Sequence, residues 1–290
     1  MDDSANANPA SSPPQEDGRR VELFAIGNEL LVGQVLDTNT HWLIQSITAL
    51  GAHVRRAHIV RDEYGEISDA IGGAIRRAPR LIVTTGGLGP TDDDLTFRAL
   101  AQLLGLPLVE DPVALEMVRR RYEHLAAIRP NFSAELNEAR RKMAWFPRGA
   151  TPLVNPNGAA PGLALDVNER TTLVSLPGVP SEMKDIFGTS MQPVLARTIG
   201  AGGYIERTIV LDRGDESRIA ALLQAVQDAH PSVYVKSRGQ MLEDGLRLTV
   251  VLSRGGRDLP AIRDAVTRAQ QDAVAGLGAL GYAVLRVTGE

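Results

Sequence analysis

Apolar residues in the first part of the chain alternate between strand-like runs and helical stripes. Short apolar runs at residues 21–26, 52–60 and 81–84 predict buried strands. Between them, apolar residues recur at helical spacing over residues 43–50 and 67–78, which predicts two amphipathic helices. The order strand, helix, strand, helix, strand favours parallel pairing with right-handed crossovers. In such sheets ligands bind beyond the carboxyl ends of the strands.

Four further regions extend this domain. Residues 111–125 and 133–143 are predicted to form two more helices, and Trp145 is expected to pack against the core. Residues 151–176 are rich in short strand patterns, and Pro180 is suited to the first turn of a following helix. We therefore predict an α/β domain of three layers, helices on both faces of a mostly parallel sheet.

The pattern changes after a glycine patch at residues 200–203. The remaining segments follow the order β-α-β-β-α-β, which is typical of a two-layer α+β module. The predicted organisation is a disordered leader over residues 1–20, the three-layer domain over residues 21–198 and a smaller two-layer α+β domain over residues 204–290.

Composition excludes several classes of protein. The 290 residues include no cysteine, which rules out disulfides, thiolate metal sites and a cysteine nucleophile. No apolar run reaches the length of a membrane span, and the polar start lacks the apolar core of a secretory signal, so we expect a cytoplasmic protein without a membrane partner. The net charge of −4 argues against a nucleic-acid partner.

The segment after the third predicted strand carries the most distinctive chemistry. Gly86, Gly87 and Gly89 let a ligand approach backbone N–H groups without a Cβ in the way. A helix is predicted over residues 97–104, with Thr96 as its N-cap. A strand, a glycine-rich loop and a helix N-terminus together are typical of an anion site, so we expect a phosphate here.

Three consecutive carboxylates, Asp92, Asp93 and Asp94, lie between the glycines and the helix. Carboxylates beside an anion site fit a divalent cation, Mg²⁺ or similar, bound between the protein and a phosphate. We assign Asp93 and Asp94 to this metal and to catalysis. The alternative is that the acids only interact favourably with the helix dipole.

Four segments resemble signatures of the CinA (competence/damage-inducible) family. They are TGGLGPTDDDLT (residues 85–96), GNELL with the nearby DTN (residues 27–31 and 37–39), NPNGAAPG (residues 155–162) and LPGVPSE (residues 176–182). Asp92 stands where family members usually have Pro. The family belongs to the molybdopterin-binding-like superfamily, so the resemblance implies that fold for the first domain, a small following domain and a homodimer.

The resemblance also implies which residues form the site. Glu29 would orient or deprotonate water beside Asp93 and Asp94. The expected substrate-binding residues are Thr85, Gly86, Gly87, Leu88, Gly89, Thr96, Asp37, Asn39, Asn155, Asn157, Gly158, Gly178 and Glu182.

The function expected from this resemblance is hydrolysis of a nucleotide diphosphate. CinA-type first domains are described as ADP-ribose pyrophosphatases that release AMP and ribose 5-phosphate. The sequence has no serine nucleophile elbow, no P-loop lysine and no histidine pair at metal spacing, so water is the expected nucleophile.

Other functions stay open beside hydrolysis. One is a molybdopterin-binding protein of molybdenum-cofactor metabolism, and the other is a regulatory module that binds a nucleotide without turnover. The expected partner is thus a small nucleotide or pterin phosphate. Many CinA proteins add a C-terminal nicotinamide-mononucleotide deamidase domain, which we expect to be absent because the sequence ends at residue 290.

Overall fold

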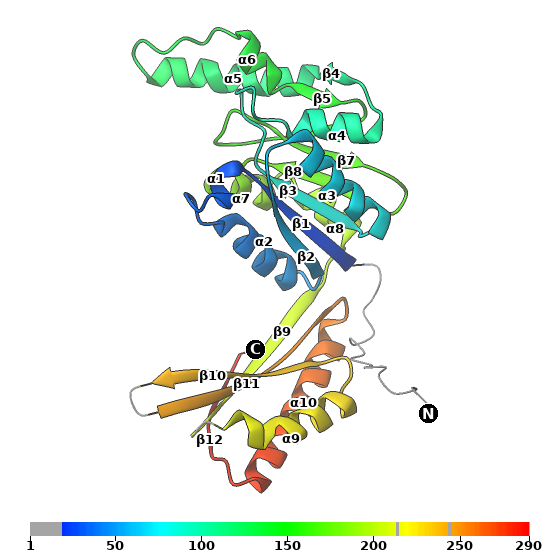
Figure 1. Cartoon of the computed structure of the whole chain (residues 1–290), viewed down its shortest axis with the longest axis vertical. Coiled ribbons are helices and arrows are strands. Elements are labelled where there is room, and N and C mark those ends of the chain that lie inside the picture. The colour runs from blue at the N-terminus through cyan, green and yellow to red at the C-terminus, as the bar shows by residue number, and fades with distance from the viewer. Residues whose placement is uncertain (1–18, 213–214, 243–244, 290) are drawn as a thin grey trace, which may run out of the picture. The chain divides into compact units, whose positions relative to one another are not determined.

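The computed structural model describes residues 19–212, 215–242 and 245–289 (Figure 1). Residues 1–18, and with them most of the predicted leader, lie outside the described residues. The chain divides into two compact units, and the smaller one contains Gly202–Glu290 and the short segment Ala49–Gly51.

The larger unit is built on a six-stranded sheet with the order β2-β1-β3-β8-β7-β6. Its strands are β1 (Arg20–Ile26), β2 (His53–Val60), β3 (Leu81–Thr85), β6 (Thr151–Leu153), β7 (Gly162–Asp166) and β8 (Thr172–Leu176). The four strands β2, β1, β3 and β8 are parallel, whereas β7 and β6 run antiparallel to their neighbours. This mostly parallel sheet confirms the predicted fold class.

Helices cover both faces of this sheet. The helices of the larger unit are α1 (Asn28–Leu31), α2 (Thr38–Ala49), α3 (Tyr64–Arg77), α4 (Thr96–Leu104), α5 (Pro112–Ile128), α6 (Glu138–Lys142), α7 (Pro180–Gly188) and α8 (Gln192–Thr198). On one face Ile82 of β3 shares a buried cluster with Ile71 of α3 and Leu100 of α4. Alternate strand positions point to the other face. There, Trp42 of α2 packs edge-on against Phe187 of α7, with ring centroids 5.1 Å apart.

The region between α4 and β6 differs from the prediction. A two-stranded antiparallel ribbon, β4 (Leu108–Glu110) with β5 (Trp145–Pro147), was not predicted, because three-residue strands carry too little periodicity. The helix expected over residues 133–143 is only α6. It begins after Asn137, whose side chain accepts a hydrogen bond from the N–H of Arg140 at 3.0 Å.

The smaller unit is a four-stranded antiparallel sheet with the order β10-β11-β9-β12. Its elements are β9 (Gly203–Leu211), α9 (Glu216–Ala229), β10 (Tyr234–Leu242), β11 (Gly245–Gly256), α10 (Leu259–Ala279) and β12 (Val284–Thr288). Residues of α9 and α10, such as Leu223 and Val266, share one buried cluster with Ile209 and Val250 of the sheet. This confirms the predicted two-layer α+β module.

None of the helices in the described ranges is long and apolar enough to cross a membrane.

Candidate functional site

The loop after β3 is held tightly against the neighbouring strands. Gly86 has a φ of 98°, and a Cβ at this position would lie 2.0 Å from the carbonyl oxygen of Ile26 at the end of β1. The N–H of Gly86 donates to the carbonyl of Leu176 at the end of β8, at 3.0 Å. The loop therefore begins where the carboxyl ends of three parallel strands meet, as the sequence predicted.

Thr96 has a different structural role from the predicted one. It is the first residue of α4 rather than its N-cap, and its hydroxyl donates to the carbonyl oxygen of Gly86 at 2.9 Å. The N–H of Thr96 donates to the carbonyl of Gly87 at 3.2 Å. The residue thus fixes the glycine loop to the helix, and its hydroxyl is not used to cap the helix.

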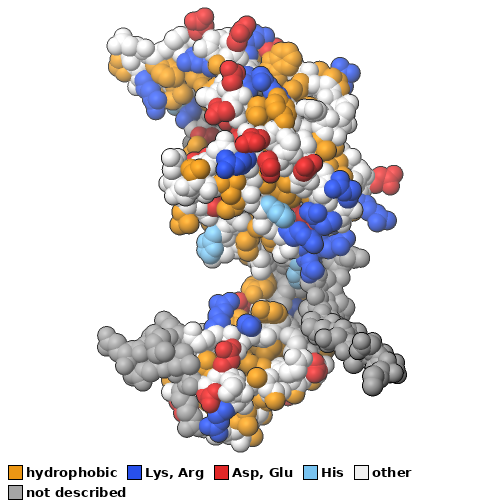
Figure 2. All heavy atoms as spheres, viewed as in Figure 1, with side chains coloured by type: hydrophobic (Ala, Val, Ile, Leu, Met, Phe, Trp, Pro, Cys, Tyr) orange, Lys and Arg blue, Asp and Glu red, His pale blue; other side chains and the backbone are white. Residues whose placement is uncertain are grey.

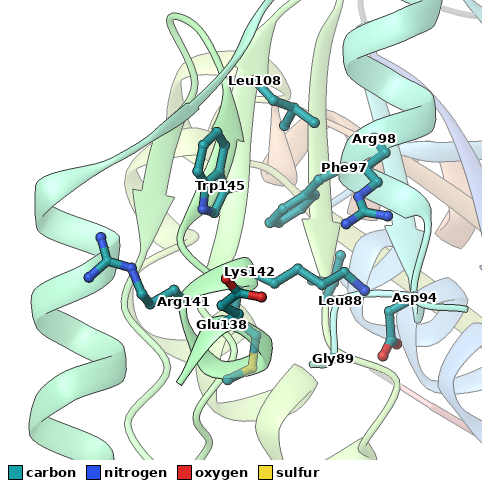
Figure 3. A pocket seen from close by; sticks show the side chains of 12 residues that line it. Leu88, Gly89, Asp94, Phe97, Arg98, Leu108, Glu138, Arg141, Lys142 and Trp145 are labelled. Atoms are coloured by element: carbon teal, nitrogen blue, oxygen red, sulfur yellow. The ribbon is translucent and has the colours of Figure 1, made fainter. Parts of the chain in front are cut away.

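Three consecutive N–H groups of the loop, those of Gly87, Leu88 and Gly89, donate to no protein acceptor within the described ranges. All three residues line a cavity of about 400 Å³, shown in Figure 3. Successive free N–H groups beside a cavity are a typical anion-binding arrangement. These free N–H groups support the anion site expected from the sequence, which stays a prediction.

Asp62, in the loop after β2, is a member of the site that the sequence analysis missed. Its Oδ1 accepts a hydrogen bond from the N–H of Leu95 at 3.1 Å, so it caps the start of α4 from a distant segment. A Cβ on Gly87 would lie 2.7 Å from its other oxygen, Oδ2. The only signal in the sequence is that Asp62 follows a predicted strand of the same sheet.

Asp94 and Lys142 are joined through Thr91. Oδ2 of Asp94 accepts hydrogen bonds from the N–H and the hydroxyl of Thr91, at 2.9 and 2.5 Å. The ammonium of Lys142, at the end of α6, donates to the carbonyl oxygen of Thr91. The acidic turn is therefore closed by its own threonine and tied to an element that follows it by about fifty residues.

The carboxylates of this turn affect the pKa of Asp62 beside them. The pKa of Asp62 is raised to about 6, mainly because burial disfavours its charged form and further because Asp94 and Asp93 lie nearby. Burial also lowers the pKa of Lys142. Asp62 therefore changes its charge closer to neutral pH than an ordinary aspartate does.

Asp62→Asn is expected to stabilise the protein at pH 7.5. The pKa of Asp62 in the folded protein lies above its value in the unfolded chain. The contribution of Asp62 to the free energy of unfolding is therefore fully present below about pH 4 and is lost as the pH rises through 6. Asparagine keeps an acceptor for the N–H of Leu95 without the charge. Allowing for partial exposure, we expect a gain of about 1 kcal/mol, or roughly 2–4 °C in Tm.

Thermal unfolding in EDTA at several pH values checks this expectation. The gain should shrink as the pH falls from 7.5 towards 4, because wild-type Asp62 is then protonated. Asp69→Asn, which removes an exposed aspartate of α3, is the matched control and should show no such trend. A gain that is the same at every pH would contradict the assignment of the charge effect to Asp62.

The loops after β1 and β8 contribute differently to the site. The Nδ2 of Asn39 donates to the carbonyl of Gly178 at 2.7 Å, and a Cβ on Gly178 would lie 3.4 Å from the Cα of Gly86. Asp37 accepts a hydrogen bond from the N–H of Thr40 at 2.9 Å and so caps α2. Asn39 and Gly178 thus lie with the glycine loop, whereas the visible role of Asp37 is local.

Glu29 lies in α1, directly after β1, and its side chain is exposed. Its carboxylate folds back over Gly27, where a Cβ would lie 2.3 Å from Oε1. The N–H of Gly27 donates to the carbonyl of Val60 at 3.0 Å, which holds this turn beside the end of β2. Thr85, the last residue of β3, is buried and does not line the cavity.

The remaining predicted residues form a separate cluster. The Nδ2 of Asn155 donates to Glu182 at 2.7 Å, and its Oδ1 accepts from the N–H of Gly158 at 2.8 Å. Asn155 and Asn157 line a second cavity of about 830 Å³, bordered by α5. The cavity at the glycine loop has other lining residues, so these asparagines and the glycine loop do not share one cavity.

No group of three or more acidic or histidine side chains within the described ranges comes together in a way that could hold a metal ion. Mg²⁺ is often held by one or two carboxylates and by substrate phosphates, which does not require such a group. A metal at Asp93 and Asp94 therefore stays a prediction. In any such site Oδ2 of Asp94 would have to keep or exchange its two hydrogen bonds from Thr91.

The cavity at the glycine loop has further walls that the sequence analysis did not assign. They come from α4, α6 and the unpredicted ribbon, and include Arg98, Glu138, Lys142 and Trp145 (Figure 3). Trp145 was expected to pack in the core, but its side chain is 44% exposed. Figure 2 shows both acidic and basic side chains on the visible face around this end of the larger unit. The choice of ligand at this cavity should therefore depend on where individual acidic and basic side chains lie.

Comparison with known proteins is consistent with this geometry. Residues 22–197, nearly the whole larger unit, match the family model described as "Probable molybdopterin binding domain". The chain belongs to the molybdopterin-binding domain family. This family domain contains the sheet, the glycine loop and the cavity described above.

Relatives of this molybdopterin-binding domain protein occur in archaea. A protein from Aeropyrum pernix is 42% identical over 237 residues, which are 81% of this chain and 85% of the relative. A protein from Pyrobaculum arsenaticum is 39% identical over 240 residues, covering 81% and 87% of the two chains. The crystal structure of the protein CinA, of unknown function, from Thermoplasma acidophilum is 34% identical, with a TM-score of 0.56. It covers 62% of this chain and 99% of that one.

Proposed function

We propose that this chain is a CinA-like protein that binds a phosphorylated pterin of the molybdopterin type in the cavity beside Gly87–Gly89. The observation that carries the proposal is that three consecutive residues with free N–H groups line that cavity. Such groups suit the phosphate of a ligand. The description of the matching family favours a pterin over other phosphorylated rings.

Two cations accompany the N–H groups. Lys142 and Arg98 both line the cavity, and Arg98 has no ion-pair partner within the described ranges. A phosphate in the loop would accept charge-assisted hydrogen bonds from them, which are stronger than neutral ones. The partly buried ammonium of Lys142 gains most from such an anion, because burial and the nearby charge of Arg98 lower its pKa.

Lys142→Gln is expected to weaken binding of neopterin monophosphate by about ten-fold or more, since a charge-assisted hydrogen bond contributes about 1.5–3 kcal/mol. Binding of unphosphorylated neopterin should change little, because only the phosphate loses a partner. Isothermal titration calorimetry of wild type and variant with both ligands measures the difference.

Lys184→Gln is the matched control, because the ammonium of Lys184 lies over the ring of Trp42, 5.6 Å from its centroid, and does not line the cavity. Its affinity for both ligands should equal that of wild type. Wild-type protein that binds neither ligand would end the proposal. Equal weakening of both ligands by Lys142→Gln would show that the phosphate does not sit at the loop.

A second candidate function is hydrolysis of a nucleotide diphosphate such as ADP-ribose, as the CinA resemblance implies. The observation that favours it is the carboxyl of Asp62, whose pKa of about 6 suits a general base near neutral pH. Asp62 lies against Gly87, close to where a phosphate would bind. An assay for AMP release from ADP-ribose, with and without Mg²⁺, decides between turnover and binding alone.

A further inference from the structure

The cavity at the glycine loop has an aromatic wall away from the free N–H groups. Trp145 of β5 and Phe97 of α4 line it together with Leu108 of β4, and Figure 3 shows the two rings below Leu108. Phe97 is 8% exposed, whereas Trp145 is 44% exposed, so the indole keeps a free surface. The volume of the cavity, about 400 Å³, is within the range of small-ligand sites.

One carboxylate in this cavity has no partner. Glu138, the first residue of α6, lines the cavity, and within the described ranges its side chain makes no hydrogen bond or ion pair. Arg141, one turn later, is engaged with Glu110, with N–O distances of 2.6–2.7 Å. Lys142 donates instead to Thr91. The carboxylate of Glu138 therefore remains available to a ligand.

We infer that Glu138 selects the ring of the ligand, accepting two hydrogen bonds from the N–H edge of a 2-amino-4-oxopyrimidine while the ring stacks on Trp145. This inference rests on the proposed function and adds a specificity-determining residue to it. A pterin or guanine places an amino group beside a ring N–H, and these two parallel donors match the two oxygens of one carboxylate.

The same arrangement acts against adenine. The Watson–Crick edge of adenine presents its amino group beside an unprotonated ring nitrogen, which is an acceptor and would face a carboxylate oxygen unfavourably. A site built to bond a donor pair rejects an analogue that lacks one donor, because a polar group is then left unpaired. Glu138 therefore favours a pterin or guanine ring over the adenine of ADP-ribose.

The test compares ligands that differ mainly in the ring. Wild type should bind neopterin monophosphate and GMP about ten- to hundred-fold more tightly than IMP, which lacks the 2-amino group, and than AMP. In Glu138→Gln, one oxygen becomes an N–H₂ donor that faces a ligand donor, so this preference should fall at least ten-fold. The affinity for AMP should stay the same or rise, because the amide offers an acceptor to the amino group of adenine and a donor to its ring nitrogen.

Glu135→Gln is the matched control, since it removes an exposed negative charge close in sequence without touching the cavity, and it should keep the preference for GMP. Trp145→Leu should weaken all four ligands by about ten-fold, because stacking does not depend on the polar edge. Melting curves confirm that each variant is folded.

The outcomes separate this inference from the function on which it rests. If wild type binds GMP and neopterin monophosphate but Glu138→Gln keeps the full preference over AMP, the role of Glu138 is overturned and phosphate binding stands. Tighter binding of AMP than of GMP by wild type would also overturn it and would favour the ADP-ribose candidate. Failure to bind any of the phosphorylated ligands would remove the proposed function itself.

Discussion

Replacing Gly86 with alanine is expected to lower the free energy of unfolding by about 3 kcal/mol. With a φ of 98°, Gly86 adopts a conformation that costs an L-residue about 1–2 kcal/mol. The new Cβ would also lie 2.0 Å from the carbonyl oxygen of Ile26, which belongs to the interior strand β1 and cannot rotate away. For a unit of this size the loss corresponds to roughly 6–12 °C in Tm, measurable by thermal or urea unfolding.

Gly33→Ala separates the two causes. Gly33 also has a positive φ, 73°, but a Cβ there meets nothing within 4 Å. Its replacement should therefore cost only the backbone strain, about 1 kcal/mol. If both variants lose the same stability, the close approach of the glycine loop to β1 is not what requires glycine at position 86.

Asp94→Asn is expected to slow any hydrolysis of ADP-ribose by about a hundred-fold or more while the protein stays folded. If Asp94 holds a catalytic metal on the diphosphate, the loss of one anionic ligand needs to remove only about 2.7 kcal/mol of transition-state stabilisation. The amide oxygen of asparagine can still accept the hydrogen bonds from Thr91, so the turn should survive. AMP release over a range of Mg²⁺ concentrations, with a melting curve for each protein, measures both effects.

Asp92→Asn is the control for this experiment, because Asp92 belongs to the same acidic run but lies exposed and does not line the cavity. It should retain most of the wild-type rate. An Asp94→Asn protein that hydrolyses as fast as wild type would show that Asp94 only closes the turn. A wild-type protein without AMP release would leave the pterin-binding proposal as the function of the loop.

Much of the larger unit could be predicted because its signals are local. The strands at residues 21–26 and 81–84 and the helix ending at Gly105 need only apolar runs and a glycine in the left-handed region. The glycine loop was predicted for the same reason, since glycines directly after a buried strand indicate a close backbone approach. The β4–β5 ribbon was missed because its pairing joins segments far apart in the chain.

The sequence by itself determined the parallel core, the small β-α-β-β-α-β unit and the position of the glycine loop, because periodicity and glycine placement act over a few residues. Only the tertiary structure decided which charges surround that loop. Asp62 reaches it from the end of β2, and Lys142 and Glu138 reach its cavity from α6. Isolated charged residues in loops or on short helices carry no sequence period. Their convergence depends on how the parallel strands place their ends and on how residues of α4 and α6 come to line one cavity.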